Sequence, residues 1–228
     1  MTKDESAAIT LYSMGWEPLD QCLHVALNVA LRSSDRRHLK PWLLFLKLLL
    51  TALSRLPSVL HRTVFRGVKL DLHEHYKQGK EIIWWGFSSC TTSIQDLEVE
   101  QALGKTGSRT IFSIECSSGK DIQEHSFYSG VDEILLLPGT LFQVVACLNP
   151  ASDLHLIHLK EIEPQFPLLN PITSAISQKS TMVRKRGGTE ICYSKPTQTE
   201  TIAGARPFEV IEMDINFPKD ESDTKSAN

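Results

Sequence analysis

The chain has 228 residues, a formal net charge of −3 and 41% hydrophobic residues, which together indicate one domain with an appendage. Its 24 basic and 27 acidic residues are nearly balanced, so charge gives no reason to expect nucleic acid as the main partner. The five cysteines include no CxxC pair, and the start of the chain lacks the apolar core of a signal peptide. We therefore expect a monomeric cytoplasmic protein with reduced thiols and no membrane segment.

Residues 1–60 have the pattern of a helical region. One helix is predicted after Pro18, and its apolar residues recur at helical spacing: Leu19, Leu23, Ala26, Val29 and Ala30. A second helix is predicted to begin near Pro41 and to end before Pro57. Its apolar face consists of Trp42, Phe45, Leu46, Leu49 and Leu53.

Residues 61–162 change to short β-strand patterns separated by turn residues. The predicted strands are 63–68, 81–88, 109–116, 133–137, 141–148 and 153–162, with one short helix at 96–103. Strands and helices do not alternate, so a doubly wound parallel sheet is not indicated. We predict an α+β fold in which N-terminal helices pack on two mostly antiparallel β-sheets, within a catalytic domain over residues 1–162.

The last 66 residues, 163–228, differ in composition and read as a C-terminal extension. Six of the 11 prolines fall there, together with many serines and threonines. One segment near 208–217 alternates apolar and polar residues, which predicts a single strand that adds to a sheet edge. The final residues, 219–228, are expected to be disordered.

Common catalytic and metal-binding motifs are absent from the sequence. There is no GxxxxGK[ST] phosphate loop, no GxGxxG and no HExxH. His73-Glu74-His75 has a spacing that suits a metal on a strand, but no other histidine or cysteine is near in sequence, so we expect a solvated loop and no metal. Arg184-Lys185-Arg186 is a short basic cluster, for which a localisation signal is the alternative to the solvated loop that three charges favour.

Three spaced features remain as candidates for chemistry. Arg66 lies in an apolar strand and is followed by Gly67, which allows close approach to the backbone. Ser89 and Thr91 follow the aromatic run at the end of a strand, and Glu133 precedes the apolar run 134–137. Each has an ordinary structural explanation: a paired arginine, turn-forming hydroxyls and a solvated loop end. Together, an arginine for phosphate and a carboxylate facing a sugar would suit an anionic, sugar-containing ligand.

These residues resemble the Arg–Ser–Glu pattern of mono-ADP-ribosyltransferases, the family of the arginine-type ecto-enzymes and the clostridial toxin-like catalytic domains. The matching stretches are Phe65-Arg66-Gly67, Phe87-x-Ser89-x-Thr91 and the loop that ends in Glu133. The helical segments S-S-D-R-R-H-L-K-P-W and L-L-T-A-L-S-R-L-P also resemble the family. The resemblance covers roughly residues 8–162 and implies NAD or NADP as substrate, without a metal.

The resemblance also implies a role for each residue in breaking the nicotinamide–ribose bond. Glu133 would bind the ribose 2′-hydroxyl and stabilise the cation at C1′, as carboxylates do in glycoside cleavage. Arg66 would hold the pyrophosphate and the backbone of Gly67 the nicotinamide amide. Ser89 would position Glu133 and the ribose, with Thr91 supporting the strand end. Positioning and preorganised charge would supply most of the rate.

The loop before Glu133 departs from the arginine-modifying branch, whose loop ends in Glu-x-Glu. Here Val131 stands in place of the first glutamate. Asp132 should point to the opposite face from Glu133 if the strand has begun there, because side chains alternate. Phe127 and Tyr128 offer an aromatic platform to an acceptor, or else pack within the loop.

Three functions remain open on the sequence alone. The first is a mono-ADP-ribosyltransferase that modifies a side chain of an unidentified protein, arginine by family resemblance although Val131 argues against it. The second is an NAD glycohydrolase, with water as acceptor. The third is a non-catalytic interaction module; the presence of Arg66, Ser89 and Glu133 together argues against it.

Overall fold

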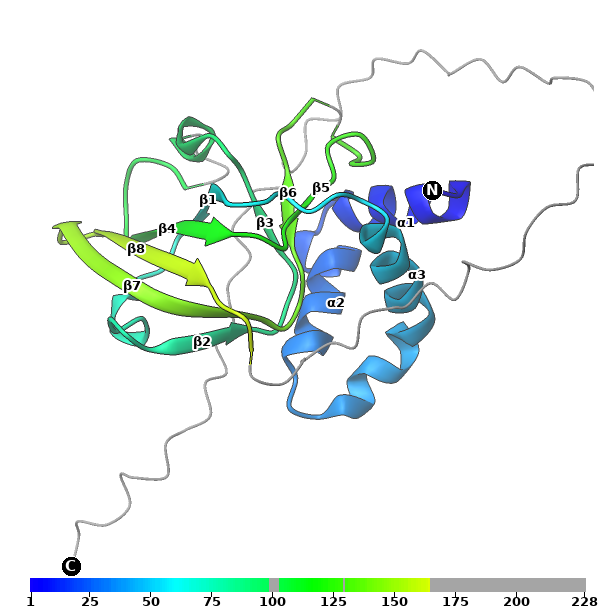
Figure 1. The fold of residues 1–228 in the computed structure, drawn as a ribbon, viewed down its shortest axis with the longest axis horizontal. Helices are drawn as coiled ribbons and strands as arrows, with labels where there is room; N and C mark the ends of the chain where they lie inside the picture. Colours follow the sequence, from blue (N-terminus) through cyan, green and yellow to red (C-terminus); the bar gives the residue numbers. More distant parts are fainter. Residues whose placement is uncertain (99–102, 129, 165–228) are drawn as a thin grey trace, which may run out of the picture.

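The computed structural model describes residues 1–98, 103–128 and 130–164. Its N-terminal third is a helical layer, coloured in blues at one side of the molecule (Figure 1). The α-helices are α1 (Lys3–Ser13), α2 (Leu23–Arg32) and α3 (Leu43–Ser54), joined by the 3-10 helices η1 (Leu19–Gln21) and η2 (Arg36–Trp42). A capping box begins α1, because Thr2 and Glu5 each accept a hydrogen bond from the other's backbone N–H.

The rest of the described chain forms two β-sheets. The larger sheet has the strand order β1-β4-β8-β7-β2, and the smaller has the order β3-β6-β5. The strands of the larger sheet are β1 (Arg62–Val68), β4 (Arg109–Cys116), β8 (Leu154–Glu161), β7 (Thr140–Ala151) and β2 (Glu81–Trp84). Those of the smaller sheet are β3 (Ser88–Cys90), β6 (Ile134–Leu136) and β5 (Lys120–Asp121), and two further 3-10 turns are η3 (His73–His75) and η4 (Ile94–Glu98). Neighbouring strands are antiparallel except for the parallel pair β4–β8.

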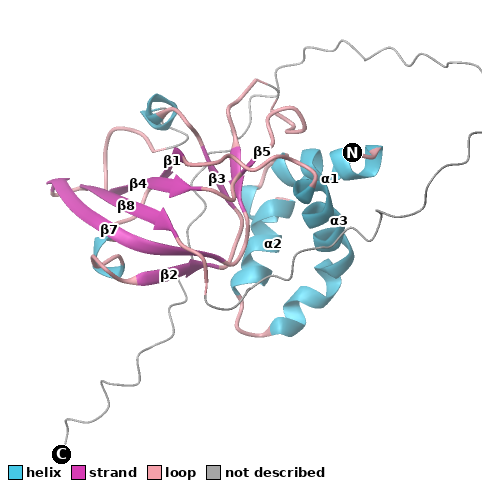
Figure 2. Cartoon of the chain, in the orientation of Figure 1, coloured by secondary structure: helices cyan, strands magenta, loops and turns pink. Residues whose placement is uncertain are grey.

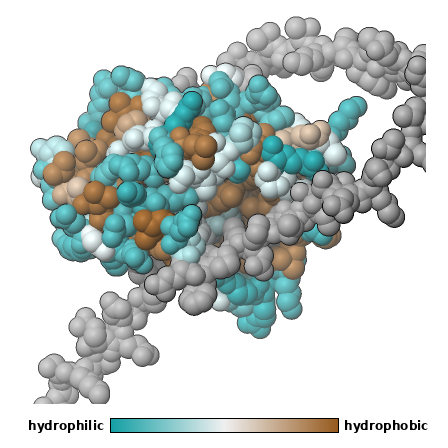
Figure 3. Space-filling model, viewed as in Figure 1, coloured by the Kyte–Doolittle hydropathy of each residue, from teal (hydrophilic) through white to brown (hydrophobic). Residues whose placement is uncertain are grey.

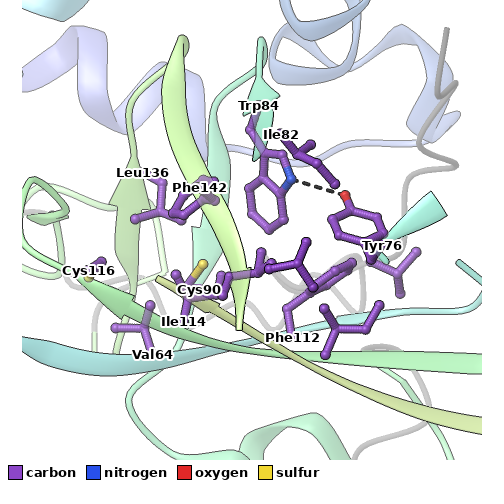
Figure 4. Close-up of a cluster of buried hydrophobic side chains, with 14 of the residues drawn as sticks. Val64, Tyr76, Ile82, Trp84, Cys90, Phe112, Ile114, Cys116, Leu136 and Phe142 are labelled. Atoms are coloured by element: carbon purple, nitrogen blue, oxygen red, sulfur yellow. Dashed lines mark hydrogen bonds between the residues drawn. The ribbon is translucent and has the colours of Figure 1, made fainter. Parts of the chain in front are cut away.

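The smaller sheet lies between the larger sheet and the helices, as the separation of strands and helices in Figure 2 illustrates. One core fills the space between the sheets, and Figure 4 shows its centre. There the Trp84 ring packs against both Phe112 and Phe142, and its indole donates a hydrogen bond to the Tyr76 hydroxyl. A second core joins α1, α2 and α3 to the other face of the smaller sheet. The central strand β6 is consequently buried on both faces.

The predicted α+β fold, with N-terminal helices on two mostly antiparallel sheets, is confirmed. The second predicted helix corresponds to α3. Two residues of its predicted apolar face, Leu49 and Leu53, are fully buried. The face predicted for α2 was partly wrong, because Val29 is 52% exposed whereas Asn28 is buried. The Asn28 amide takes this buried position because it bonds the Phe87 backbone N–H and the Tyr12 hydroxyl.

Two other elements differ from prediction. The run 81–88, predicted as one strand, is divided between β2 and β3, which belong to different sheets. The break lies at Gly86, where a Cβ would approach the Asn28 side-chain oxygen to 3.0 Å, so the chain turns where it meets α2. The predicted helix 96–103 is in part the shorter turn η4, and residues 99–102 lie outside the described residues.

The surface seen in Figure 3 carries its apolar side chains in patches separated by hydrophilic residues. No helix among the described residues combines the length and the apolar character that crossing a bilayer requires. The four cysteines of residues 1–164 are free thiols. The strand predicted near 208–217, the basic cluster at 184–186 and the expected disorder of 219–228 all lie outside the described residues.

Candidate active site

Glu133 is the most buried carboxylate of the described chain, with 1% of its surface exposed. Its two side-chain oxygens each accept a hydrogen bond from a serine. Ser89 Oγ donates to Oε1 at 2.6 Å, and Ser126 Oγ donates to Oε2 at 3.0 Å. Burial raises the pKa of Glu133, and the two hydroxyl groups oppose that shift by favouring the charged form.

The strand that follows fixes the direction of the Glu133 side chain. In β6, Ile134 and Leu136 enter the core between the sheets, whereas Leu135 enters the core beneath the helices. Since side chains alternate along an extended chain, Glu133 shares the helix-facing side with Leu135. The Ile122 backbone N–H donates to the Glu133 carbonyl at 3.1 Å and continues the pairing of the sheet to this residue.

Ser89 lies on the neighbouring strand β3, where it pairs with Leu135 of β6 and therefore faces the same side as Glu133. Its backbone carbonyl accepts a hydrogen bond from Arg66 Nη1 at 2.7 Å. Arg66, Ser89 and Glu133 are consequently brought together by direct contacts although they are far apart in the chain.

Arg66 reaches this site from β1, at the edge of the larger sheet. Next to it, Phe65 and Thr91 exchange backbone hydrogen bonds of 2.7 and 2.9 Å, which form an isolated bridge between the two sheets. The Nε of Arg66 is buried and, within the described part of the chain, has no hydrogen-bond partner. A buried guanidinium N–H without a partner is unfavourable, and it is a donor that an anionic oxygen can satisfy.

Gly67 presents its backbone polar groups to the same region. In an antiparallel strand, successive residues direct their N–H and C=O groups to opposite sides. Those of Phe65 bond Thr91 on β3, so those of Gly67 also point away from β4 and toward the Ser89 side. A Cβ added to Gly67 would lie 3.0 Å from the Leu103 side chain, so a larger residue at this position would require Leu103 to shift.

Thr91 and Asp132 have separate structural contacts close to Glu133. The buried Thr91 hydroxyl donates to Asp96 Oδ2 at 2.9 Å, which fixes η4 to the end of β3. Asp132 Oδ2 accepts hydrogen bonds from both the backbone N–H (2.9 Å) and the hydroxyl of Thr92. The two adjacent carboxylates therefore have different partners, and the Asp132 side chain is engaged at the end of β3.

The loop before Glu133 contains the predicted acceptor-side residues. Phe127 is 43% exposed, its ring packs edge-on against Tyr128 at 5.2 Å, and its N–H donates to Ser13 of α1 at 2.8 Å. Val131 is half-buried, and its N–H donates to the Tyr128 carbonyl at 3.3 Å. The two aromatic rings thus pack on each other, and Phe127 also offers exposed surface.

Sequence reasoning missed several residues that contribute to this site. Ser126 not only donates to Glu133 but also accepts from the Tyr128 N–H at 3.3 Å, so it connects the loop to the carboxylate. From the helices, the Tyr12 hydroxyl is buried, and its pKa is raised by burial and then by the negative charge of Glu133. Burial lowers the pKa of His24, and the positive charge of Arg66 contributes to that shift. The sequence signal for this helical side of the site was Asn28, a polar residue within an apolar helix, whose amide bonds the Tyr12 hydroxyl.

Comparisons with known proteins identify the family of the chain. The family model of the NAD:arginine ADP-ribosyltransferases matches residues 1–165. The rabbit (Oryctolagus cuniculus) GPI-linked NAD(P)(+)--arginine ADP-ribosyltransferase 1 is 33% identical over 101 residues, which are 44% of this chain and only 29% of the rabbit protein.

Solved structures of ADP-ribosyltransferases share the fold. The Vis toxin of Vibrio splendidus, in complex with an inhibitor, superposes with a TM-score of 0.58 at 21% identity, over 71% of this chain and 74% of the toxin. HopU1 of Pseudomonas syringae pv. Tomato gives a TM-score of 0.54 at 21% identity, over 69% of this chain and 76% of its own. The family resemblance predicted from the sequence is confirmed.

Proposed function

The chain belongs to the NAD:arginine ADP-ribosyltransferase family, and from this membership we propose that it is an NAD-dependent mono-ADP-ribosyltransferase. It would break the bond between nicotinamide and C1′ of the adjoining ribose and transfer ADP-ribose to a protein side chain. The observation that carries the proposal is the buried Glu133, which accepts a 2.6 Å hydrogen bond from Ser89 close to the guanidinium of Arg66.

In the proposed reaction, nicotinamide leaves C1′ with the bonding electron pair, and positive charge develops on the ribose. The Glu133 carboxylate would stabilise that charge and accept a hydrogen bond from the 2′-hydroxyl. Its side chain is already oriented by Ser89 and Ser126, so little reorganisation is needed when the bond breaks. A nucleophile of the acceptor then bonds to C1′ and loses its proton.

The residues around Glu133 would hold the rest of the NAD molecule. The unpartnered Nε–H of Arg66 suits a pyrophosphate oxygen, and the outward-facing backbone groups of Gly67 suit the nicotinamide amide. Ser89 would orient both Glu133 and the ribose. Thr91 would act indirectly, by supporting the end of the strand that carries Ser89, since its hydroxyl fixes η4 to the end of β3 through Asp96.

A second function, NAD glycohydrolysis, is favoured by the acceptor side of the site. Val131 provides no carboxylate for a guanidinium, and the Asp132 carboxylate is bound to Thr92. A crystal structure of Vis contains agmatine, a guanidinium compound, so at least one protein of similar fold binds such a group. In this chain the corresponding carboxylate is missing, and water is the acceptor that needs none.

Radiolabelled NAD incubated with the full chain and a cell lysate separates the two functions. We expect label on protein if transfer dominates, and free ADP-ribose with unlabelled protein if hydrolysis dominates. Glu133→Gln serves as the matched control in both assays. Absence of both products from the folded wild-type chain would contradict either activity and would favour a non-catalytic module.

The acceptor protein, the expected monomeric state and the expected cytoplasmic location stay predictions. In this scheme the reaction uses NAD as a substrate and no metal.

A further inference from the structure

The turn after β1 and the start of β8 bring three metal-binding side chains together. Asp71, His73 and His155 each offer one ligand atom, and these atoms all lie within 4.8 Å of one another. Asp71 Oδ1 is 2.6 Å from His73 Nδ1 and 3.3 Å from His155 Nε2. The two imidazole rings stack with their centroids 4.6 Å apart. The carboxylate oxygen is therefore shared by two imidazoles.

His155 has a buried ring nitrogen that makes no hydrogen bond within residues 1–98, 103–128 and 130–164. The residue is 4% exposed, and its Nδ1 lies 2.8 Å from the side-chain oxygen of Asn149. Since that oxygen only accepts, Nδ1 carries a proton and donates it to Asn149. Nε2 has no hydrogen-bond partner within the described residues, and it faces the Asp71 carboxylate. In the neutral imidazole this buried nitrogen presents a lone pair to the carboxylate, and a cation between the two would stabilise the arrangement.

His73 has the complementary arrangement. Its Nδ1 faces Asp71, and its Nε2 lies 2.7 Å from Glu74 Oε1. Each imidazole thus directs one nitrogen to the shared centre and has its other nitrogen beside an oxygen acceptor. Metal-binding histidines have this arrangement, because the outer acceptor orients the ring and makes the inner nitrogen a stronger ligand.

The buried Thr110 holds the two ligand-bearing segments in place. Its hydroxyl accepts from the Leu72 N–H at 3.1 Å and donates to the Leu70 carbonyl at 2.7 Å. Thr110 also pairs with His155 between the parallel strands β4 and β8. The turn η3 is further anchored by the buried Tyr76. The ligand positions therefore depend on the core and not on the solvent-exposed turn alone.

We propose that Asp71, His73 and His155 form a binding site for one zinc ion, which would fasten the turn η3 to β8. Two imidazole nitrogens and one carboxylate oxygen are a ligand set that suits zinc, and a water molecule would complete four-coordination. The turn lies near the end of the larger sheet that is away from the helices (Figure 1), so the site is separate from Glu133. This inference does not depend on the proposed transfer reaction.

The proposal revises the expectation that His73 and Glu74 lie in a solvated loop without metal. His155 is 82 residues further along the chain, and only the β4–β8 pairing brings it to the turn. The competing explanation is a metal-free ion cluster in which a protonated His73 bridges Asp71 and Glu74. That explanation accounts for His73, but it leaves His155 Nε2 at 3.3 Å from Asp71 without a hydrogen bond among the described residues.

Calorimetric titration of the full chain with zinc chloride at neutral pH tests the proposal. We expect one bound equivalent and a rise in melting temperature when zinc is added. Asp71→Asn and His155→Ala should each weaken binding at least about tenfold and abolish the thermal shift, and Asn149→Ala should weaken it about tenfold. His73→Gln, in a half-buried position, gives a further variant if His155→Ala does not fold.

Matched controls separate this site from other zinc ligands. His158 is also on β8 and lies 3.0 Å from Glu115, so His158→Ala removes a similar histidine–carboxylate pair and should leave zinc binding unchanged. Cys147→Ser should also retain binding, and cobalt(II) should bind without a thiolate charge-transfer band. No thermal shift in the wild type, or binding that survives both Asp71→Asn and His73→Gln, would overturn the proposal and favour the metal-free cluster.

Discussion

Two regions of the protein each bury an ionisable side chain close to a strand end, and they satisfy its polar atoms differently. Near β6, both carboxylate oxygens of Glu133 accept hydrogen bonds from serines. Near β8, one nitrogen of His155 is hydrogen-bonded, and the other makes no hydrogen bond among the described residues. In the proposed reaction the first arrangement orients a carboxylate toward the ribose, whereas in the proposed zinc site the second leaves a ligand atom available. The contrast predicts that changes at Glu133 alter catalysis and that changes at His155 alter metal binding.

The largest expected effect is at Glu133. Glu133→Gln keeps the shape and hydrogen-bonding capacity of the side chain but removes its negative charge. We expect turnover of NAD to fall by at least ~100-fold, the scale of losing one preorganised electrostatic group, while NAD binding is largely retained. Steady-state hydrolysis and calorimetric titration with NAD measure the two quantities.

His155→Ala is the paired variant that tests the contrast, because it removes the buried ionisable group of the other region. Its NAD turnover should match that of the wild type. Near-normal turnover in Glu133→Gln would remove the catalytic assignment of that residue.

The next largest effect is expected for Arg66 and concerns binding. Arg66→Ala removes charge-assisted hydrogen bonds to phosphate, which contribute roughly 1.5–3 kcal/mol, so the affinity for NAD should fall about 10- to 100-fold. Arg66→Lys should restore only part of it, because an ammonium group lacks the planar fork. If calorimetry gives wild-type affinity for a folded Arg66→Ala variant, the arginine serves only to hold the Ser89 carbonyl.

Ser126 gives a smaller effect that isolates one of the two hydrogen bonds to Glu133. Ser126→Ala removes a bond worth about 0.5–1.5 kcal/mol, so turnover should fall roughly two- to tenfold. Because this hydroxyl opposes the rise in the Glu133 pKa, the acidic limb of the pH–rate profile should also move to higher pH. Ser54→Ala, which removes an exposed hydroxyl from the end of α3, is the control. An unmoved acidic limb would show that Ser126 only packs the loop.

The raised pKa of Glu133 also predicts how stability depends on pH. A carboxyl group whose pKa is higher in the folded than in the unfolded protein binds more protons in the folded state between the two values. Stability from this group is therefore present at low pH and is lost as pH rises through the folded pKa. The amide side chain that Glu133→Gln introduces cannot titrate. The melting temperature of this variant should therefore rise relative to that of the wild type as pH increases above the ordinary glutamate range. A constant difference across pH would contradict the raised pKa.

The sequence identified the residues that the structure brings together at the site better than the contacts that support them. Arg66, Ser89 and Glu133 were candidates by their positions on strands, the resemblance to mono-ADP-ribosyltransferases joined them into one site, and the structure brings them into contact. Ser126 was missed because hydroxyls are ordinary in loops. The division of 81–88 between two sheets was missed because the apolar pattern continues across Gly86, and only the contact with α2 explains the break.

The smallest expected effect concerns the acceptor. Recognition of a guanidinium requires a carboxylate that binds it with paired hydrogen bonds, and Val131 supplies none. We expect the wild type to hydrolyse NAD but to modify agmatine weakly, and Val131→Glu to raise transfer to agmatine severalfold, because about 1 kcal/mol of added binding corresponds to such a factor. Chromatographic separation of ADP-ribosyl-agmatine from ADP-ribose measures both products in one reaction.

Asp132 provides the decisive control for this last prediction, since it is the only other carboxylate beside Glu133 in the loop 126–133. Its Oδ2 is already bonded to the N–H and the hydroxyl of Thr92, so turning it toward an acceptor would break both bonds. Asp132→Asn keeps an acceptor oxygen for Thr92 and should leave agmatine transfer and hydrolysis unchanged. If the wild type modifies agmatine rapidly and Asp132→Asn abolishes only that transfer, then Asp132 leaves Thr92 during the reaction and takes the place of the missing glutamate.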